Sequence, residues 1–503
     1  MKAYSQEEVL RRYSSGPILL LLRRVFAVIV TFASTITIAR LLTPRDYGLA
    51  AMSIVIMSFM QIFRDFGMSN ALMRKGAIDT REVSFMFWFN VAATIVIAAV
   101  IAIASPAFAL FYREPAVVDI ILVSLIGFII EGVCLQHAAI LKRDLRFGVI
   151  ATAETAGIAI GFVTGLTLAY YLRNVWAIVI MGLVQSAVTS LIMVLKADWH
   201  PGRYKKPDSL KELIVFGANA SAFSILNFFS RNASTFAIGH FMAPASLGLF
   251  NRAFALYQMP LNNLIQPLAQ AALPVMARLR SSPDIYRTTY CKLVRTICCA
   301  VGPAGAILIF ASNPLIIALL GQKWAEAGPV LAALSASLII YGLVWPIGDL
   351  LITQNRSHEL RTAGIYDFVL RVGGATIGAY FGLFWAAAGV TIGLLATVPI
   401  RVWQSGRTGP VSAGDQYRAF ASSVPLSASG LGGSYLGLMA GNALGYAAGG
   451  QALSSLICGM VLTIAGGCLF SSSRAAMIET ISTFGGGRFL SLANRITAKE
   501  MKA

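Results

Sequence analysis

Uncharged apolar runs, each long enough to cross a lipid bilayer, recur from one end of this chain to the other. Residues 83–112, for example, contain no Asp, Glu, Lys or Arg, and a membrane-spanning helix needs only about 20 apolar residues. We therefore predict an all-α polytopic membrane protein with about fourteen transmembrane helices. The expected spans are 17–39, 46–66, 83–105, 117–141, 149–172, 175–195, 213–239, 246–270, 289–311, 328–353, 363–382, 384–403, 419–440 and 452–471.

The net charge of +18 is distributed as a topology signal. Lys and Arg concentrate in alternate loops, such as 142–146, 196–212, 356–361 (with Arg356) and 401–418 (with Arg401), whereas the loop at 441–451 contains none. About thirty cationic residues fall on one side of the predicted membrane and about five on the other, which is the bias expected of cytoplasmic loops. The pattern predicts that both termini are cytoplasmic and argues against a nucleic-acid-binding surface.

A sequence repeat indicates that the chain contains two related helix bundles. Residues 38–49 read IARLLTPRDYGL and residues 238–249 read IGHFMAPASLGL, so Pro44 and Gly48 recur as Pro244 and Gly248. The span before each copy has a polar stripe along one helical face. The stripes are Arg24, Thr31, Ser34 and Thr35 before the first copy, and Ser224, Arg231, Ser234 and Thr235 before the second.

Two glycine series support the duplication and predict its arrangement. The fifth expected span contains Gly157, Gly161 and Gly165, and the eleventh contains Gly374, Gly378 and Gly382. Small residues at this spacing let helix backbones approach closely in lipid. Because six spans return the chain to the same side, we expect two parallel six-helix repeats that form N- and C-lobes around a central cavity. The predicted domains are a cytoplasmic interfacial segment 1–16, the N-lobe 17–195, a basic linker 196–212, the C-lobe 213–403, two appended helices within 404–471 and a cytoplasmic tail 472–503.

Ionisable residues inside the apolar spans are the candidate functional residues. A charge at the bilayer centre costs about 2.5–3.5 kcal/mol on insertion scales, so it usually faces a wet cavity or a partner. We predict a substrate-binding cavity lined by Arg24, Arg231, Asn227, Ser224, Arg252 and Arg371. Asp65, Glu131, Glu154, Asp349 and Asp367 are predicted to neutralise this cavity or to relay a coupling ion. Arginines in a wet cavity favour phosphate or pyrophosphate, which a guanidinium grips with two parallel hydrogen bonds.

Several of these charges also have purely structural interpretations. Arg64, like Asp65 beside it, lies near the end of a span, where its side chain can reach the membrane surface. Asp367 and Arg371 are four residues apart and can neutralise each other on one helix. Glu131 and Glu154 can pair with arginines to hold helices in register, without a role in transport.

Motifs for metal binding or catalysis do not occur in this sequence. The six cysteines form no C-x-x-C pair and the four histidines are scattered, so we expect no metal site. Walker A and Gly-x-Ser-x-Gly motifs are absent. We therefore expect a transporter that is not an enzyme and that has no cofactor, apart from a coupling Na⁺ or H⁺.

The chain closely resembles bacterial polysaccharide flippases of the multidrug/oligosaccharidyl-lipid/polysaccharide (MOP) exporter superfamily. The resemblance is carried by four segments, 38–53, 63–75, 216–256 and 319–324. They are most similar to the flippases for colanic-acid-type and succinoglycan-type exopolysaccharides. The resemblance implies translocation of undecaprenyl-pyrophosphate-linked oligosaccharide repeat units across the bacterial inner membrane by alternating access, for exopolysaccharide or lipopolysaccharide biosynthesis. It also implies a polysaccharide polymerase and chain-length or export proteins as partners, besides the membrane lipids. One departure is that Ser234 and Thr235 stand where relatives often have Asp-Arg.

Other functions compete with this interpretation. A cation-coupled drug exporter of the same superfamily is the nearest, although its cavity should be dominated by carboxylates and aromatic rings. A lipid II flippase and a structural scaffold are further alternatives. A membrane polysaccharide polymerase or ligase needs a large outward loop with catalytic residues, and no outward loop of this chain is long enough.

Overall fold

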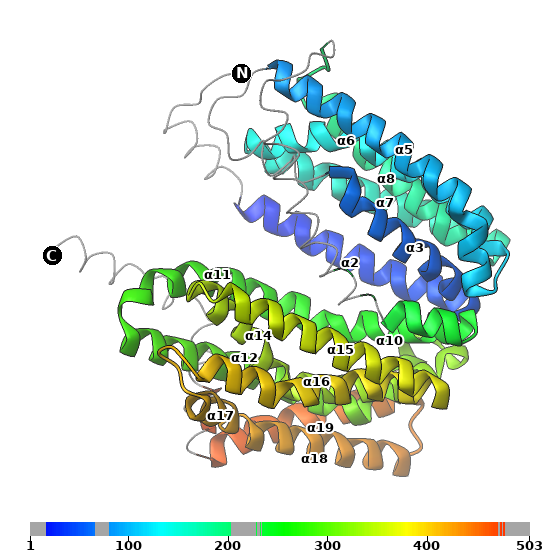
Figure 1. Cartoon of the computed structure of the whole chain (residues 1–503). Coiled ribbons are helices and arrows are strands. Elements are labelled where there is room, and N and C mark those ends of the chain that lie inside the picture. Colours follow the sequence, from blue (N-terminus) through cyan, green and yellow to red (C-terminus); the bar gives the residue numbers. More distant parts are fainter. Residues whose placement is uncertain are drawn as a thin grey trace. The chain divides into compact units, whose positions relative to one another are not determined.

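Helices form all the regular structure that the computed structural model describes, which comprises residues 17–65, 80–202, 228, 232, 234–470, 473, 474, 476 and 477. The chain divides into two compact units, 1–248 and 249–503, and Figure 1 follows the helices of each along the sequence. The predicted linker 196–212 is described only as far as Gly202, and most of the predicted seventh span, 213–239, lies outside the described residues.

Long helices build the N-terminal unit (Figure 1). They are α2 (Pro17–Leu41), α3 (Pro44–Asp65), α5 (Thr80–Tyr112), α6 (Ala116–Arg143), α7 (Phe147–Leu172) and α8 (Trp176–Lys196), and α10 (Pro244–Pro260) begins within the unit. Helix α6 packs against α3, α5 and α8, and α7 packs against α2 and α8. This arrangement places α6 at the centre of the unit.

The repeated Pro and Gly motif marks the starts of two helices that touch through their backbones. Pro44 is the first residue of α3 and Pro244 is the first residue of α10, positions at which proline costs no hydrogen bond. A Cβ atom on Gly48 would lie 1.7 Å from the Pro244 carbonyl oxygen, and one on Gly248 would lie 1.8 Å from the Pro44 carbonyl oxygen. The motif therefore repeats because each copy supplies one half of a reciprocal backbone contact.

The C-terminal unit contains the rest of α10 and the helices that follow it (Figure 1). They are the π-helical turn η1 (Leu261–Ile265), α11 (Gln266–Arg278), η2 (Leu279–Ser281), α12 (Pro283–Leu320), η3 (Gln322–Trp324), α13 (Ala327–Ala336), α14 (Leu338–Thr353), α15 (Ser357–Phe381), α16 (Leu383–Gly406), α17 (Ala413–Ala421), α18 (Val424–Ala443) and α19 (Ala448–Leu469). Helix α12 packs against α13, α14, α18 and α19, so it forms the core of this unit.

The described helices agree with a protein that crosses the membrane many times. Eight of them are long and apolar enough to span a bilayer, and α13 with α14 gives a ninth if this pair, bent by 51°, counts as one span. Large apolar side chains point outward, including Ile103, Leu110 and Leu469, which are about 80% exposed; such surfaces suit lipid contact. The count of fourteen remains a prediction.

Glycine seams join the fifth and sixth helices of each predicted repeat. On α7, a Cβ atom at Gly157 would lie 2.8 Å from the Gln185 carbonyl oxygen of α8, and on α15 one at Gly378 would lie 2.1 Å from the Trp385 carbonyl oxygen of α16. The two series nevertheless differ in depth. Gly157 is the eleventh residue of α7 and Gly374 the eighteenth of α15, so the glycines themselves are offset by about two helical turns.

The two appended helices α18 and α19 pack tightly onto α12. Ser434 of α18 donates a 2.7 Å hydrogen bond to the Ile307 carbonyl of α12, and its hydroxyl lies 2.7 Å from that of Ser455 in α19. Gly433 and Gly437 of α18 leave no room for a Cβ atom against α19. The Gly- and Ser-rich composition of these helices is therefore explained by close packing within the membrane.

The six cysteines are all free. Cys298 is fully buried in the core of the C-terminal unit beside Tyr290 and Val294.

Candidate functional site

A small cavity, lined mainly by apolar residues but containing several polar groups, lies between α3, α6 and α8 in the N-terminal unit. It has a volume of about 210 Å³, and its walls contain the hydroxyls of Ser53, Ser58, Ser124 and Ser186 together with Gln61 and Glu131. Helical spacing explains how α3 contributes to it, because Ala50, Ser53, Met57 and Gln61 recur every three or four residues along one face. The carboxylate of Glu131 is the ionisable group of this cavity.

Three side chains hold the Glu131 carboxylate. Ser186 donates a 2.7 Å hydrogen bond to Oε1. Arg64 donates to Oε2 at 3.1 Å, and Gln61 donates to the same oxygen at 3.4 Å. Because the Glu131 side chain is 33% exposed and the Arg64 side chain only 10%, the carboxylate faces the cavity while the guanidinium is enclosed.

The Arg64 side chain is buried within the unit. It turns towards α6, where it also donates to the Phe128 carbonyl at 3.3 Å and lies 5.2 Å from the centroid of the Phe128 ring. The prediction that Glu131 pairs with an arginine is confirmed. The pair neutralises both charges within the unit, which keeps the cost of burying them low.

A second charge cluster lies between α15 and α16 in the C-terminal unit. The Asp367 carboxylate is 3.3 Å from Nε of Arg371, one turn further along α15, and 3.8 Å from Nη1 of Arg401 on α16. All three side chains are largely buried, being 15–22% exposed. Tyr341 and Tyr257 lie beside Arg371, and the Tyr257 hydroxyl accepts a 3.0 Å hydrogen bond from Ser337 at the bend between α13 and α14.

This cluster has a net charge of +1, because it contains two arginines and one carboxylate. One carboxylate serves two guanidinium groups, so a single anion that approached Arg371 and Arg401 would complete the balance. The prediction that Asp367 and Arg371 interact on one helix is confirmed. Arg401 was missed because it lies near the end of a span, among the cations that were interpreted as topology signals.

Three predicted site residues have a described environment outside these clusters. Arg252 of α10 is partly buried and donates to the Asn251 side chain at 3.2 Å. Asp349 of α14 has one buried carboxylate oxygen without a hydrogen-bond partner among the described residues. Glu154 of α7 is exposed and forms no ion pair within the described part of the chain, so the interpretation that it pairs with an arginine is not supported there.

The side chains of the other predicted site residues lie outside the described part of the structure. Ser224, Asn227 and Arg231 lie outside the described residues. Arg24 belongs to α2 and Asp65 ends α3, but their side chains are not among those described. The central cavity predicted between the two repeats therefore remains a prediction, and each cluster is assigned to its own unit.

Solved structures with this arrangement of helices are membrane transporters. The lipid II flippase MurJ in an inward closed conformation superposes with a TM-score of 0.73 at 13% identity, covering 90% of this chain and 98% of that one. An inward-facing multidrug resistance MATE family transporter of the MOP superfamily gives a TM-score of 0.62 at 14% identity, covering 79% and 99%. These similarities show that the chain has the fold seen in these two transporters.

The family follows from the sequence itself. Residues 37–329 match the family described as "Polysaccharide biosynthesis protein", and the chain belongs to this family. It is similar to the lipopolysaccharide biosynthesis protein WzxC of Escherichia coli K12, with 25% identity over 71% of this chain and 73% of that protein. It is also similar to the teichuronic acid biosynthesis protein TuaB of Bacillus subtilis 168, with 23% identity over 59% and 62%.

Proposed function

We propose that this protein translocates undecaprenyl-pyrophosphate-linked oligosaccharide repeat units across the bacterial inner membrane, for exopolysaccharide or lipopolysaccharide biosynthesis. The observation that carries the proposal is the excess positive charge of the Asp367, Arg371 and Arg401 cluster, buried between two apolar helices. Membership of a polysaccharide biosynthesis family supports it. Both termini face the cytoplasm in this proposal.

Pyrophosphate recognition would use the arginines. In the absence of substrate, Asp367 acts as the counter-ion of both guanidinium groups. An incoming pyrophosphate brings oxygens that can accept paired hydrogen bonds from Arg371 and Arg401, which a lysine could not donate in the same geometry. Arg24 and Arg231 keep their predicted role as further contacts to the substrate, and the sugar chain passes through the aqueous interior as the protein alternates between inward and outward access.

The cavity around Glu131 is proposed as the coupling site. Glu131 is the carboxylate that faces this cavity, and an ionisable residue in such a position can relay a coupling proton or Na⁺. Ser186 and Gln61 would supply additional oxygen or amide contacts to the bound ion. A polysaccharide polymerase and chain-length or export proteins would then use the product on the far side.

The test is made in a strain that lacks this protein but retains the upstream glycosyltransferases. We expect pyrophosphate-linked repeat units to accumulate in the cytoplasmic leaflet while surface polysaccharide disappears. Arg371→Ala and Arg401→Ala should fail to restore export at normal protein abundance. Arg361→Ala, which removes an exposed arginine from the same helix α15, should restore it and serves as the matched control.

Each result has a distinct meaning. Repeat units that reach the outer leaflet unpolymerised would indicate a polymerase instead. Unchanged lipid and polysaccharide pools would refute the flippase. Normal export with both Arg371→Ala and Arg401→Ala, or with Arg24→Ala and Arg231→Ala combined, would refute the respective arginine assignments.

A further inference from the structure

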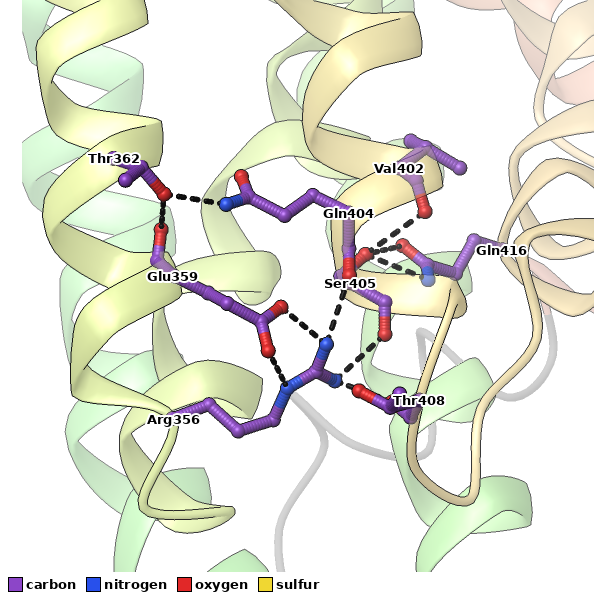
Figure 2. A network of polar contacts seen from close by, with 8 residues as sticks. All are labelled: Arg356, Glu359, Thr362, Val402, Gln404, Ser405, Thr408 and Gln416. Carbon is purple, nitrogen blue, oxygen red and sulfur yellow. Dashed lines mark hydrogen bonds and ion pairs between the residues drawn. The ribbon is translucent and has the colours of Figure 1, made fainter.

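Arg356 joins the start of α15 to the end of α16. Its guanidinium donates to the carbonyl oxygens of Gln404 and Ser405, both at 2.8 Å, and to that of Thr408. Nε donates to Glu359 one turn into α15, which completes an ion pair with the same guanidinium. Figure 2 shows Arg356 at the centre of these contacts, between the two helices.

The chemistry of helix ends explains this arrangement. The last carbonyls of a helix have no intrahelical partner, and they carry the negative end of the helix dipole. A guanidinium offers five donors in a plane and can therefore satisfy several carbonyls and a carboxylate at once. Neighbouring side chains extend the network, because Gln404 donates to Thr362 on α15 and Ser405 exchanges hydrogen bonds with Gln416 on α17 (Figure 2).

The N-terminal unit contains the same turn. Before α7 the chain passes through Leu145 with φ 54°, and before α15 it passes through Asn355 with φ 57°. In both turns the next residue is an arginine at the N-cap, and its backbone N–H donates to the carbonyl five residues earlier, from Arg146 to Leu141 at 2.9 Å and from Arg356 to Leu351 at 2.8 Å.

The partners of the two arginines also correspond. Arg146 forms a 2.5 Å ion pair with Asp198, just beyond the end of α8, and Arg356 donates to Thr408, just beyond the end of α16. In each case the partner lies 52 residues further along the chain. The contact differs in chemistry, a carboxylate in one unit and a backbone carbonyl in the other, but it joins the same two positions of the repeat.

We propose that Arg146 and Arg356 are equivalent positioning residues, each of which clamps the fifth and sixth helices of its repeat into one rigid pair. Neither arginine contacts the candidate site. Gln404, which accepts a hydrogen bond from Arg356, lies one turn after Arg401 on α16. Asp367 and Arg371 lie further along α15, the helix that begins at the Arg356 contact. The Arg356 clamp therefore sets the register in which one Asp367 carboxylate reaches both arginines. This role in transport rests on the proposed flippase function.

The test combines a local structural measurement with transport. Hydrogen–deuterium exchange of the purified full-length protein reports the clamp directly and needs no substrate. In Arg356→Ala, amides of residues 404–412 and 354–362 should exchange about tenfold faster, because several hydrogen bonds that oppose local opening are lost. Arg356→Lys keeps the charge but cannot reach all the acceptors, so it should be intermediate. Arg361→Ala should match the wild type.

The same variants are then assayed for polysaccharide export at matched abundance. We expect Arg356→Ala to reduce export severalfold, Arg356→Lys to restore part of it, and Arg361→Ala to leave it unchanged. In the N-terminal unit, Arg146→Ala and Arg146→Lys should affect export in the same way as the corresponding Arg356 variants. Their faster hydrogen–deuterium exchange should occur around residues 196–200. Unchanged exchange in Arg356→Ala would refute the clamp. Faster exchange with normal export would refute its role in positioning the transport machinery. If the wild-type protein restores no export, the flippase proposal fails, while the exchange data still decide the clamp.

Discussion

Two adjacent glycines of α15 provide a controlled test of how closely this helix packs against α16. A Cβ atom on Gly374 would lie 2.3 Å from the Gly389 carbonyl oxygen and 2.9 Å from its carbon, whereas one on Gly373 would meet nothing within 4 Å. We expect Gly374→Ala to destabilise the protein and Gly373→Ala to leave it unchanged or slightly more stable.

The size of the expected loss of stability in Gly374→Ala follows from these distances. Ordinary contact begins at 3.4 Å, so the two backbones must separate by about 1 Å, and overpacking of this kind costs about 1–3 kcal/mol. The gain of about 1 kcal/mol from replacing glycine by alanine in a helix applies to both variants and cancels in their comparison. For a chain of this size the difference corresponds to a lower midpoint of thermal denaturation for Gly374→Ala, on the order of 1–3 °C.

The assay heats both variants in the same detergent and measures the fraction that remains monodisperse, so the midpoint is an operational one. Separation of α15 from α16 should also weaken the contact between Asp367 and Arg401. Equal midpoints for the two variants, or a higher one for Gly374→Ala, would refute the close backbone packing inferred from the glycine seam.

Two further predictions concern ion pairs. Arg64→Ala should lower the free energy of unfolding by about 2 kcal/mol, which is less than the 3–5 kcal/mol typical of a fully buried pair because the Glu131 side chain is partly exposed. Adding Glu131→Gln to this variant should recover most of the loss. If the two substitutions instead lowered the denaturation midpoint additively, the pairing would be contradicted. In α17, the hydrogen bond from Arg287 at 2.5 Å lowers the pKa of Asp415 to about 2. The ionised carboxylate therefore stabilises the fold above about pH 4, and this contribution is lost as the pH falls towards 2. The acid-induced drop in denaturation midpoint should be smaller in Asp415→Asn than in the wild type, whereas the exposed Asp284→Asn should follow the wild type.

The contacts of the candidate site and of the proposed helix clamps arise between residues that are far apart in the sequence. Arg64 and Glu131 are 67 residues apart, and Arg146 and Asp198 are 52 apart. A helical period predicts which residues share a face of one helix, and it therefore predicted the contact between Asp367 and Arg371. It does not state which helix lies opposite, so Arg401 and Arg356 were interpreted only as loop cations.

The membrane-spanning all-α class and the repeated Pro and Gly motif were determined by the sequence alone, because apolar length and backbone-permissive residues are local properties of the chain. The tertiary structure decided what those local features contact: the reciprocal approach of Gly48 and Gly248, the two-turn offset between the glycine series, and the sharing of Asp367 by two arginines. Charge pairing in an apolar medium depends on distances of a few ångströms between helices, and helix packing sets those distances.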